Sequence, residues 1–388
     1  MWNLGKRLWK GGGRESRHAF FTFDRPLVIL QSDDWGRVGV RDREGYESLR
    51  QQGIQLGQHP YDFYTLETAC DVTALMALLR RHRDSVHRPP SMVMNFLLAN
   101  LDFPRMTACD FQEISLLFLS HGLPGHWRRP KLFDSYREGI AQGVFYPALH
   151  GLTHFCRAAA EAALLNHGKR GELLRSLWQA ETPFIYWRMP WIGYEYHNPD
   201  KPNPGFLSAE TQQLLIRRAA EEFRKFFSCP PRSACAPGYR ANEMTHQAWC
   251  ECGVRVAQNG SGAPRHPHFD DCGVLNLYRT IDIEPSSREL SIEKYVQLAA
   301  GNFARGIPAV VSMHSINFHS SLKDFRTPSI RVLDEFLSAL EALHPDLLYV
   351  NDEDVYRIVT EGKFEAAGET VSIRCQQHDA DAATARTR

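Results

Sequence analysis

The 388-residue sequence contains no apolar run long enough to span a membrane as a helix, which takes about 18 residues or more. It has no excess of either charge, because 45 lysines and arginines balance 45 aspartates and glutamates. The balance argues against nucleic acid as a partner. Residues 1–10 lack the apolar core of a secretory signal, and their tryptophans alternate with basic residues. This segment therefore fits either a basic tail or a peripheral membrane contact.

Regular cysteine spacing is also missing. Nine cysteines stand at irregular intervals, which argues against a disulfide framework and favours reduced thiols in a cytoplasmic protein. The Gly-x-Ser-x-Gly turn of serine hydrolases does not occur, so that class of enzyme is disfavoured.

What the chain does contain is an alternation of strand-like and helix-like segments. The apolar run at 26–32 predicts a buried parallel strand. Further strands are predicted at 92–96, 143–149, 232–236, 254–258, 309–313 and 347–350, and helices at 73–86, 131–142, 208–227, 244–252, 291–304 and 328–343. This order predicts an α/β protein whose parallel sheet is closed or curved, with helices outside. Residues 376–388 are small and polar, and we expect a disordered tail there.

Chemically capable side chains follow four of the predicted strands. They are Asp33-Asp34, His150 to His154, Ala236 to Arg240, and His314. Because functional groups collect at the C-terminal edge of a parallel sheet, we expect these four segments to meet there.

His150 and His154 are four residues apart, so on a helical turn both imidazoles project from one face and can bind one metal ion. A carboxylate as the third ligand would leave coordination positions open for water and substrate, as in catalytic sites. The alternative is two unrelated histidines in a chain that has seventeen.

Asp33 and Asp34 would point to opposite faces if the strand stayed regular. Where a strand ends, both carboxylates can face one cavity, so that one binds a metal while the other stays free as a base. A nearby cation would remove the cost of two close negative charges. The alternative is that the pair caps a turn.

With these motifs in this order, the chain resembles the polysaccharide deacetylase family, the NodB-homology domain of carbohydrate esterase family four. The resemblance implies an irregular (β/α) barrel over residues 26–358, with an aromatic-rich insertion at 155–205. Residues 1–25 would be a basic N-terminal segment and 359–388 a C-terminal extension with a polar tail.

The resemblance also implies a role for each motif residue. Asp33 would be the general base and His314 the general acid, with His319 as a rival for the acid. Asp34, His150 and His154 would bind a divalent metal, for which zinc is the expected identity. The substrate would contact Pro237, Gly238 and Tyr239, and a backbone N–H near Tyr239 would assist the oxyanion.

Two positions depart from the family pattern. Many relatives carry an arginine two residues before the motif proline, where it holds the catalytic aspartate; here that residue is Cys235. Arg240, or else Arg232, is expected to supply the guanidinium, and Arg240 is preferred. Trp35 replaces a common glycine and predicts a narrower mouth or a stacking wall for the substrate.

The insertion carries a dense aromatic cluster at 184–197. Flat aromatic rings suit the apolar faces of sugars, so Trp187 and Trp191 are predicted to contact carbohydrate. The alternative is a small hydrophobic core under a long loop.

The function implied is a metal-dependent deacetylase that hydrolyses an N-acetyl group on an amino sugar of a glycan, or of a lipid-linked or nucleotide-linked precursor. Two alternatives remain open at this point. The same site would suit a deformylase or an O-deacetylase, and the chain would also suit a carbohydrate-binding relative that has lost catalysis.

Overall fold

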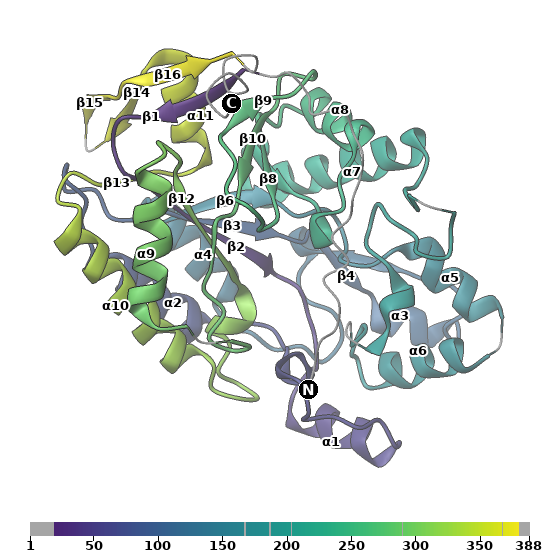
Figure 1. Ribbon diagram of the computed structural model, residues 1–388. Helices are drawn as coiled ribbons and strands as arrows, with labels where there is room; N and C mark the ends of the chain where they lie inside the picture. Colours follow the sequence, from purple (N-terminus) through teal and green to yellow (C-terminus); the bar gives the residue numbers. More distant parts are fainter. Residues whose placement is uncertain are drawn as a thin grey trace.

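The computed structural model describes residues 19–379, except 167, 186, 187, 203, 289 and 367. At its centre is a curled sheet in which eight neighbouring strands are parallel, in the order β11-β12-β2-β3-β6-β7-β8-β10 (Figure 1). Their bounds are β2 Leu27–Trp35, β3 Met92–Phe96, β6 Phe145–Leu149, β7 Ser233–Cys235, β8 Val256–Asn259, β10 Leu275–Tyr278, β11 Ile281–Asp282 and β12 Ala309–His314. A further strand, β13 (Leu348–Tyr349), pairs with the start of β2.

The two ends of this parallel row are joined by only Arg279 and Thr280. The backbone N–H of Arg279 donates to Asn259 of β8 at 3.1 Å, and that of Thr280 donates to Val310 of β12 at 2.9 Å. The extended segment β10–β11 therefore changes partner from β8 to β12 within two residues. Because it touches both ends of the row, the sheet curls into an irregular barrel at this point.

The strands have two buried faces, which explains apolar runs such as Leu27 to Leu30 in β2 and Ala309 to Val311 in β12. Along β2, Ile29 packs inside the barrel with Val93 and Val310, whereas Val28 and Leu30 pack against the surrounding helices. The alternation of strand side chains thus gives both an inner and an outer core.

Helices cover the outside of the sheet, with α2, α9 and α10 on the left of Figure 1 and α7 and α8 at its upper right. The bounds are α2 Ala69–Leu79, α4 Leu132–Ala141, α7 Ala209–Phe227, α8 Glu243–Glu251, α9 Ile292–Phe303 and α10 Arg326–Leu343. The start of α7 is set by Ser208, whose side chain accepts a hydrogen bond from the N–H of Thr211. α2 starts earlier than predicted, because Thr68 and Asp71 form a capping box at its N-terminus, and it ends at Leu79.

The insertion contains α5 (Arg157–Leu165) and α6 (Lys169–Gln179), which lie together at the lower right of Figure 1 near α3 (Phe103–Ala108). The other elements are α1 Arg43–Gln51, α11 Asp352–Glu361, and the two-stranded sheets β4 Ala99–Leu101 with β5 Leu116–Phe118 and β14 Lys363–Ala366 with β15 Glu369–Ser372. In the described ranges, no helix is long and apolar enough to cross a membrane.

The two ends of the described chain pair with each other. β1 (Phe20–Phe23) runs antiparallel to β16 (Cys375–His378) and continues the sheet through β9 (His268–Phe269). The prediction of disorder from residue 376 is therefore wrong for β16, because this strand forms backbone pairs with β1 that no local pattern reveals. The predicted membrane contact of residues 1–10 lies outside the described residues.

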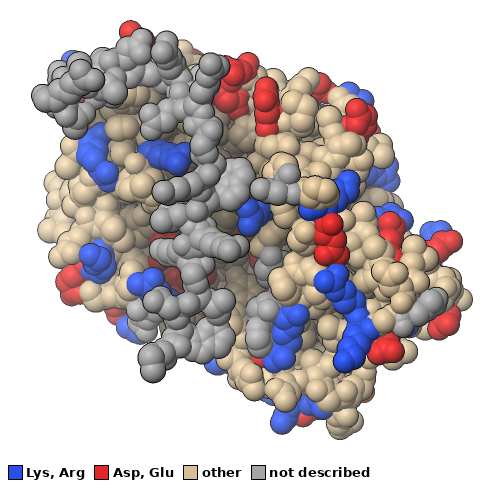
Figure 2. All heavy atoms as spheres, turned by 45° about the vertical axis from the view of Figure 1, so that its right-hand side comes forward, with Lys and Arg blue, Asp and Glu red and all other residues tan. Residues whose placement is uncertain are grey.

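Basic and acidic side chains are interspersed on the face drawn in Figure 2. This distribution matches the balanced charge of the sequence.

Candidate metal centre and active site

Asp33 and Asp34 end strand β2 in an irregular conformation. Asp34 has a φ of 74°, and the register between β2 and β3 shifts between Ser32 and Trp35. Aspartate tolerates this left-handed conformation better than most residues. The shift breaks the alternation of the strand, and both carboxylates consequently line the same cavity.

Asp34, His150 and His154 converge in that cavity. Oδ1 of Asp34 lies 3.6 Å from Nε2 of His150 and 3.3 Å from Nε2 of His154. The ligand atoms of the three side chains all lie within 4.8 Å of one another. Residues from β2 and from the loop after β6 thus form one compact donor set.

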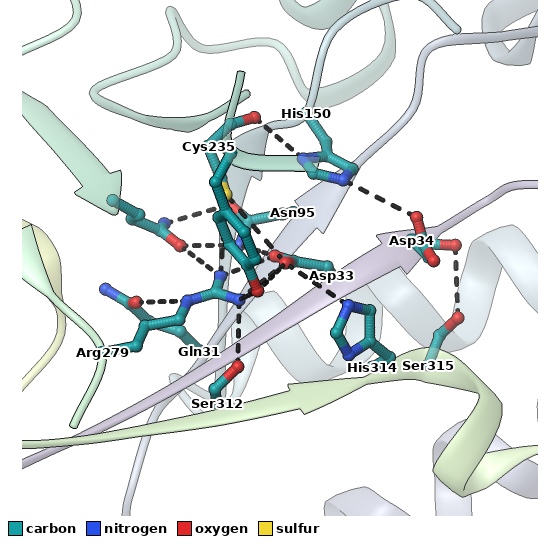
Figure 3. Close-up of polar contacts among 12 residues, drawn as sticks. Gln31, Asp33, Asp34, Asn95, His150, Cys235, Arg279, Ser312, His314 and Ser315 are labelled. Atoms are coloured by element: carbon teal, nitrogen blue, oxygen red, sulfur yellow. Dashed lines mark hydrogen bonds and ion pairs between the residues drawn. The ribbon is translucent and has the colours of Figure 1, made fainter. Parts of the chain in front are cut away.

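The tautomer of His150 suits a metal ligand. Its Nδ1 lies 2.8 Å from the carbonyl oxygen of Cys235, and because a carbonyl only accepts, Nδ1 carries the proton (Figure 3). Nε2 therefore presents its lone pair toward Asp34. In the described part of the chain this buried nitrogen has no hydrogen-bond partner.

The imidazole of His154 is held neutral. Burial lowers the pKa of His154 to about 3, and the neighbouring Asp34 opposes this only in part. Two imidazoles and one carboxylate are a donor set that zinc and similar divalent ions bind, with positions left open for other ligands. The residues present therefore fit a divalent metal.

Glu195, in the insertion, holds the loop between the two histidines. Its buried carboxyl group accepts hydrogen bonds from the backbone N–H of Leu152 at 2.9 Å and of Thr153 at 3.1 Å. Burial raises the pKa of Glu195 to about 8, although these N–H groups oppose the shift. The insertion thus contributes to the shape of the candidate metal centre.

Asp33 is held by an arginine inside the barrel. Both terminal nitrogens of Arg279 contact the Asp33 carboxylate at 2.6 Å, one to each oxygen, and Asn95 donates to Oδ1 at 2.7 Å (Figure 3). Burial alone would raise the pKa of Asp33, but the buried Arg279 guanidinium more than offsets it and keeps that pKa well below its usual range. Asp33 is therefore ionised at neutral pH.

The prediction that Arg240 or Arg232 supplies this guanidinium is wrong. Arg240 is exposed and stands over the ring of Tyr194 at 6.0 Å, and Arg232 donates to the carbonyl of Gly253 at 3.3 Å. The guanidinium comes instead from Arg279, because the closing segment β10–β11 carries this side chain into the barrel interior.

His314 pairs with a second carboxylate. Its Nδ1 lies 2.6 Å from Oε1 of Glu284, and its Nε2 lies 3.9 Å from Oδ2 of Asp33. Burial would lower the pKa of His314, but Glu284 outweighs it and raises that pKa to about 9. His314 is therefore protonated at neutral pH. The rival His319 is buried 3.2 Å from Glu67 and is not part of the cavity wall.

The cavity has a volume of about 230 Å³. It is lined by Asp33, Asp34, Arg37, Tyr61, His150, His154, Tyr194, Gly238, Tyr239 and His314. Of the residues predicted to contact substrate, Gly238 and Tyr239 are in the wall, while Pro237 is buried beside them.

The predictions for the tryptophans fail at two positions. Trp35 is fully buried and stacks on Phe318 with ring centres 5.8 Å apart, because the irregular end of β2 turns it away from the cavity. Trp191 packs partly buried against the main core, with Arg170 5.0 Å over its ring, which agrees with the alternative of a core under a loop. Trp187 lies outside the described residues.

Four residues that hold the motif side chains were missed from the sequence: Asn95, Glu195, Arg279 and Glu284. The wall residues Arg37, Tyr61 and Tyr194 were not predicted as site residues either. Arg279 directly follows β10, and Glu284 is the second residue after β11. The rule that polar residues after strands face the site would have found both, had these short strands been recognised. Asn95 sits within a predicted strand, and Glu195 has no local signal.

Comparison with solved structures shows the fold. A candidate glycoside hydrolase/deacetylase from Parabacteroides distasonis matches over 93% of this chain and 83% of its own, with 10% identity and a TM-score of 0.50. A candidate polysaccharide deacetylase from Mycobacterium smegmatis (90% and 92%, 12% identity, TM-score 0.46) and an allantoinase (87% and 92%, 10% identity, TM-score 0.46) also match.

No family model matches the sequence, and a comparison with curated protein sequences returns no match. The fold is thus shown by the three-dimensional similarity and not by the sequence, because the sequence identity to the solved structures is low. The predicted irregular (β/α) barrel is confirmed, and the fold of this chain is similar to that of the candidate glycoside hydrolase/deacetylase from Parabacteroides distasonis.

Proposed function

We propose that this protein is a metal-dependent hydrolase that removes the acetyl group from an N-acetylated amino sugar. One observation carries the proposal: a single cavity joins the Asp34, His150 and His154 donor set to an ionised Asp33 and a protonated His314. Amide hydrolysis needs a base for the attacking water and an acid for the leaving nitrogen, and these two groups provide both.

Asp34, His150 and His154 would hold the metal. A divalent ion bound there, for which zinc is our proposal, would polarise the acyl carbonyl and lower the pKa of a coordinated water. Asp33 accepts the proton of the attacking water, and Arg279 and Asn95 keep its carboxylate in place. His314 then donates its Nε2 proton to the departing amine, while Glu284 stabilises the imidazolium.

The walls of the cavity suit a sugar. Tyr61, Tyr194 and Tyr239 line it, and aromatic rings with polar edges pack against the apolar faces of sugar rings. These tyrosines take the place of the tryptophans that the sequence suggested. A lipid-linked or nucleotide-linked sugar in the cytoplasm remains our proposal for the physiological substrate.

The test is elemental analysis of the purified protein followed by assays of the released acid. We expect about one divalent ion per chain and acetate release from N-acetylated amino sugars that stops on chelation and returns with zinc. Release of formate would show that the enzyme removes a formyl group instead of an acetyl group. Release of acetate from O-acetylated sugars only would show that it cleaves an ester instead of an amide. Sugar binding without any hydrolysis by the metal-loaded protein would indicate an inactive binding relative.

A further inference from the structure

Arg37 is a cavity residue that the mechanism above does not use. It lines the cavity next to Asp34, and its side chain is only 8% exposed. Its guanidinium lies 4.0 Å from the ring centre of Tyr64 and 5.4 Å from that of Phe184. Aromatic contacts of this kind cover the faces of the guanidinium plane and leave its N–H groups at the edge.

The ion pair between Arg37 and Asp34 is longer than the two closest ion pairs at the cavity. Nη1 of Arg37 lies 3.4 Å from Oδ1 of Asp34, whereas the Asp33–Arg279 pair and the pair between His314 and its glutamate are both at 2.6 Å. A guanidinium has five donors, and this long contact involves one terminal nitrogen. Apart from this contact and a hydrogen bond with the Tyr64 side chain, N–H groups of Arg37 are left for another acceptor.

The partner oxygen of Arg37 is also the oxygen of the candidate metal centre. Oδ1 of Asp34 faces Arg37 and the Nε2 atoms of both histidines. A ligand bound beside the metal ligands would thus come within reach of the guanidinium.

The charges of the cavity favour an anion. Without a metal, each of the three ion pairs is neutral. A divalent ion on Asp34 adds two positive charges, and because Asp34, Arg37 and His150 in the cavity wall are buried, an unbalanced charge beside them is costly. With the metal bound, the cavity would carry an excess of positive charge, and Arg37 contributes one of these charges.

We propose that Arg37 binds a carboxylate or phosphate carried by the amino sugar, so that the substrate is an acidic rather than a neutral sugar. Arginine suits both groups, since its planar fork donates two parallel hydrogen bonds to an oxyanion. This inference rests on the proposed function and specifies its substrate class.

The zinc-reconstituted full-length protein provides the test. Acetate release is compared for N-acetylglucosamine, its 1-phosphate and its uronic acid. We expect kcat/KM to be about tenfold or more higher for one of the two acidic sugars, and the better of the two identifies the anion. Equal or faster hydrolysis of the neutral sugar would overturn the inference while leaving the deacetylase proposal intact.

Binding is measured separately by calorimetry with glucosamine, glucosamine 1-phosphate and the corresponding uronic acid. Tighter binding of an acidic sugar without acetate release from any substrate would support the anion site and reject the deacetylase proposal. Absence of any preference in binding and in hydrolysis would reject the anion site.

Variants of Arg37 sharpen the result. Arg37→Gln should reduce the preference for the acidic sugar by about tenfold through KM, and Arg37→Lys should restore part of it, with zinc content and melting temperature recorded for each. Arg240→Gln, which removes an exposed arginine near the cavity wall, is the matched control and should keep the preference. An equal fall of kcat for neutral and acidic sugars would instead assign Arg37 to oxyanion stabilisation.

Discussion

The surroundings of Asp33 and Asp34 differ sharply although the two residues are adjacent. Asp33 faces the barrel interior, where Arg279 and Asn95 contact it at 2.6 to 2.7 Å. Asp34 faces the histidines and Arg37, and its side-chain contacts there are 3.3 to 3.6 Å long. Tight contacts hold a side chain in one position, whereas a looser set leaves room for a ligand.

The close contacts of Asp33, here called the tight region, continue into a buried hydrogen-bond network. Arg279 also donates to Gln31 at 3.1 Å and to Gln258 at 3.0 Å, and Gln258 in turn donates to the buried Asp352 at 2.8 Å. Because buried charges are stable only when paired and hydrogen-bonded, this network makes the orientation of Asp33 hard to change. Asp33, the proposed base, is therefore held rigidly, whereas the longer contacts of Asp34 leave it able to bind a ligand.

Asp34→Asn tests the contrast most severely. The variant should lose the metal and lower kcat by about ten-thousandfold or to background, because the carboxylate ligand is gone. Metal content by elemental analysis and acetate release measure the two effects. Full metal content in a folded variant would contradict the assignment of Asp34.

Asp33→Asn is its matched counterpart. We expect the metal to stay bound while kcat falls by about a hundredfold to ten-thousandfold, because the amide cannot take a proton. The same two measurements apply. If this variant also lost its metal, the separation between the two aspartates would be wrong.

Arg279→Met tests the rigidity of the tight region. Removing the guanidinium leaves Asp33 buried without its cation, which should lower the free energy of unfolding by about 3–5 kcal/mol. Denaturant titration measures the change. The double variant with Asp33→Asn should recover part of the loss, and a variant as stable as the parent would show that the pair is not needed.

Glu284→Gln concerns the proton on His314. In the parent, kcat/KM should fall as the pH rises through about 9, because His314 then loses its proton. Without Glu284 the pKa of His314 drops, so this limb should move to lower pH and activity at pH 8 should fall by about tenfold. A pH profile that does not move would remove His314 from the role of acid.

Arg240→Gln should have the smallest effect. Its side chain is exposed and lies away from Asp33, so kcat/KM should remain within about twofold of the parent. A large loss would restore Arg240 to the catalytic site.

Much of the fold was predictable because its signals are local. The strand at 92–96 and the helix that Ser208 caps agree with the structure, since periodicity and capping act over a few residues. β10 and β11 were missed, because short strands of four and two residues leave little pattern.

Trp35 shows a second limit of prediction from the sequence. Trp35 was expected at the cavity because it follows the aspartates, but a left-handed residue before it reverses its direction. The conformation of Asp34 depends on packing around β2, so composition alone could not predict where Trp35 points.

The sequence by itself determined most of the parallel strands, the motif residues at their ends and the convergence of Asp34 with the two histidines, because parallel strands bring their C-terminal ends to one edge. Only the tertiary structure decided that Arg279, 246 positions from Asp33, is its partner, and that Glu195 supports the loop between the histidines. The physical reason is barrel closure: a contact across the closing seam depends on the curvature of the whole sheet, which no local pattern records.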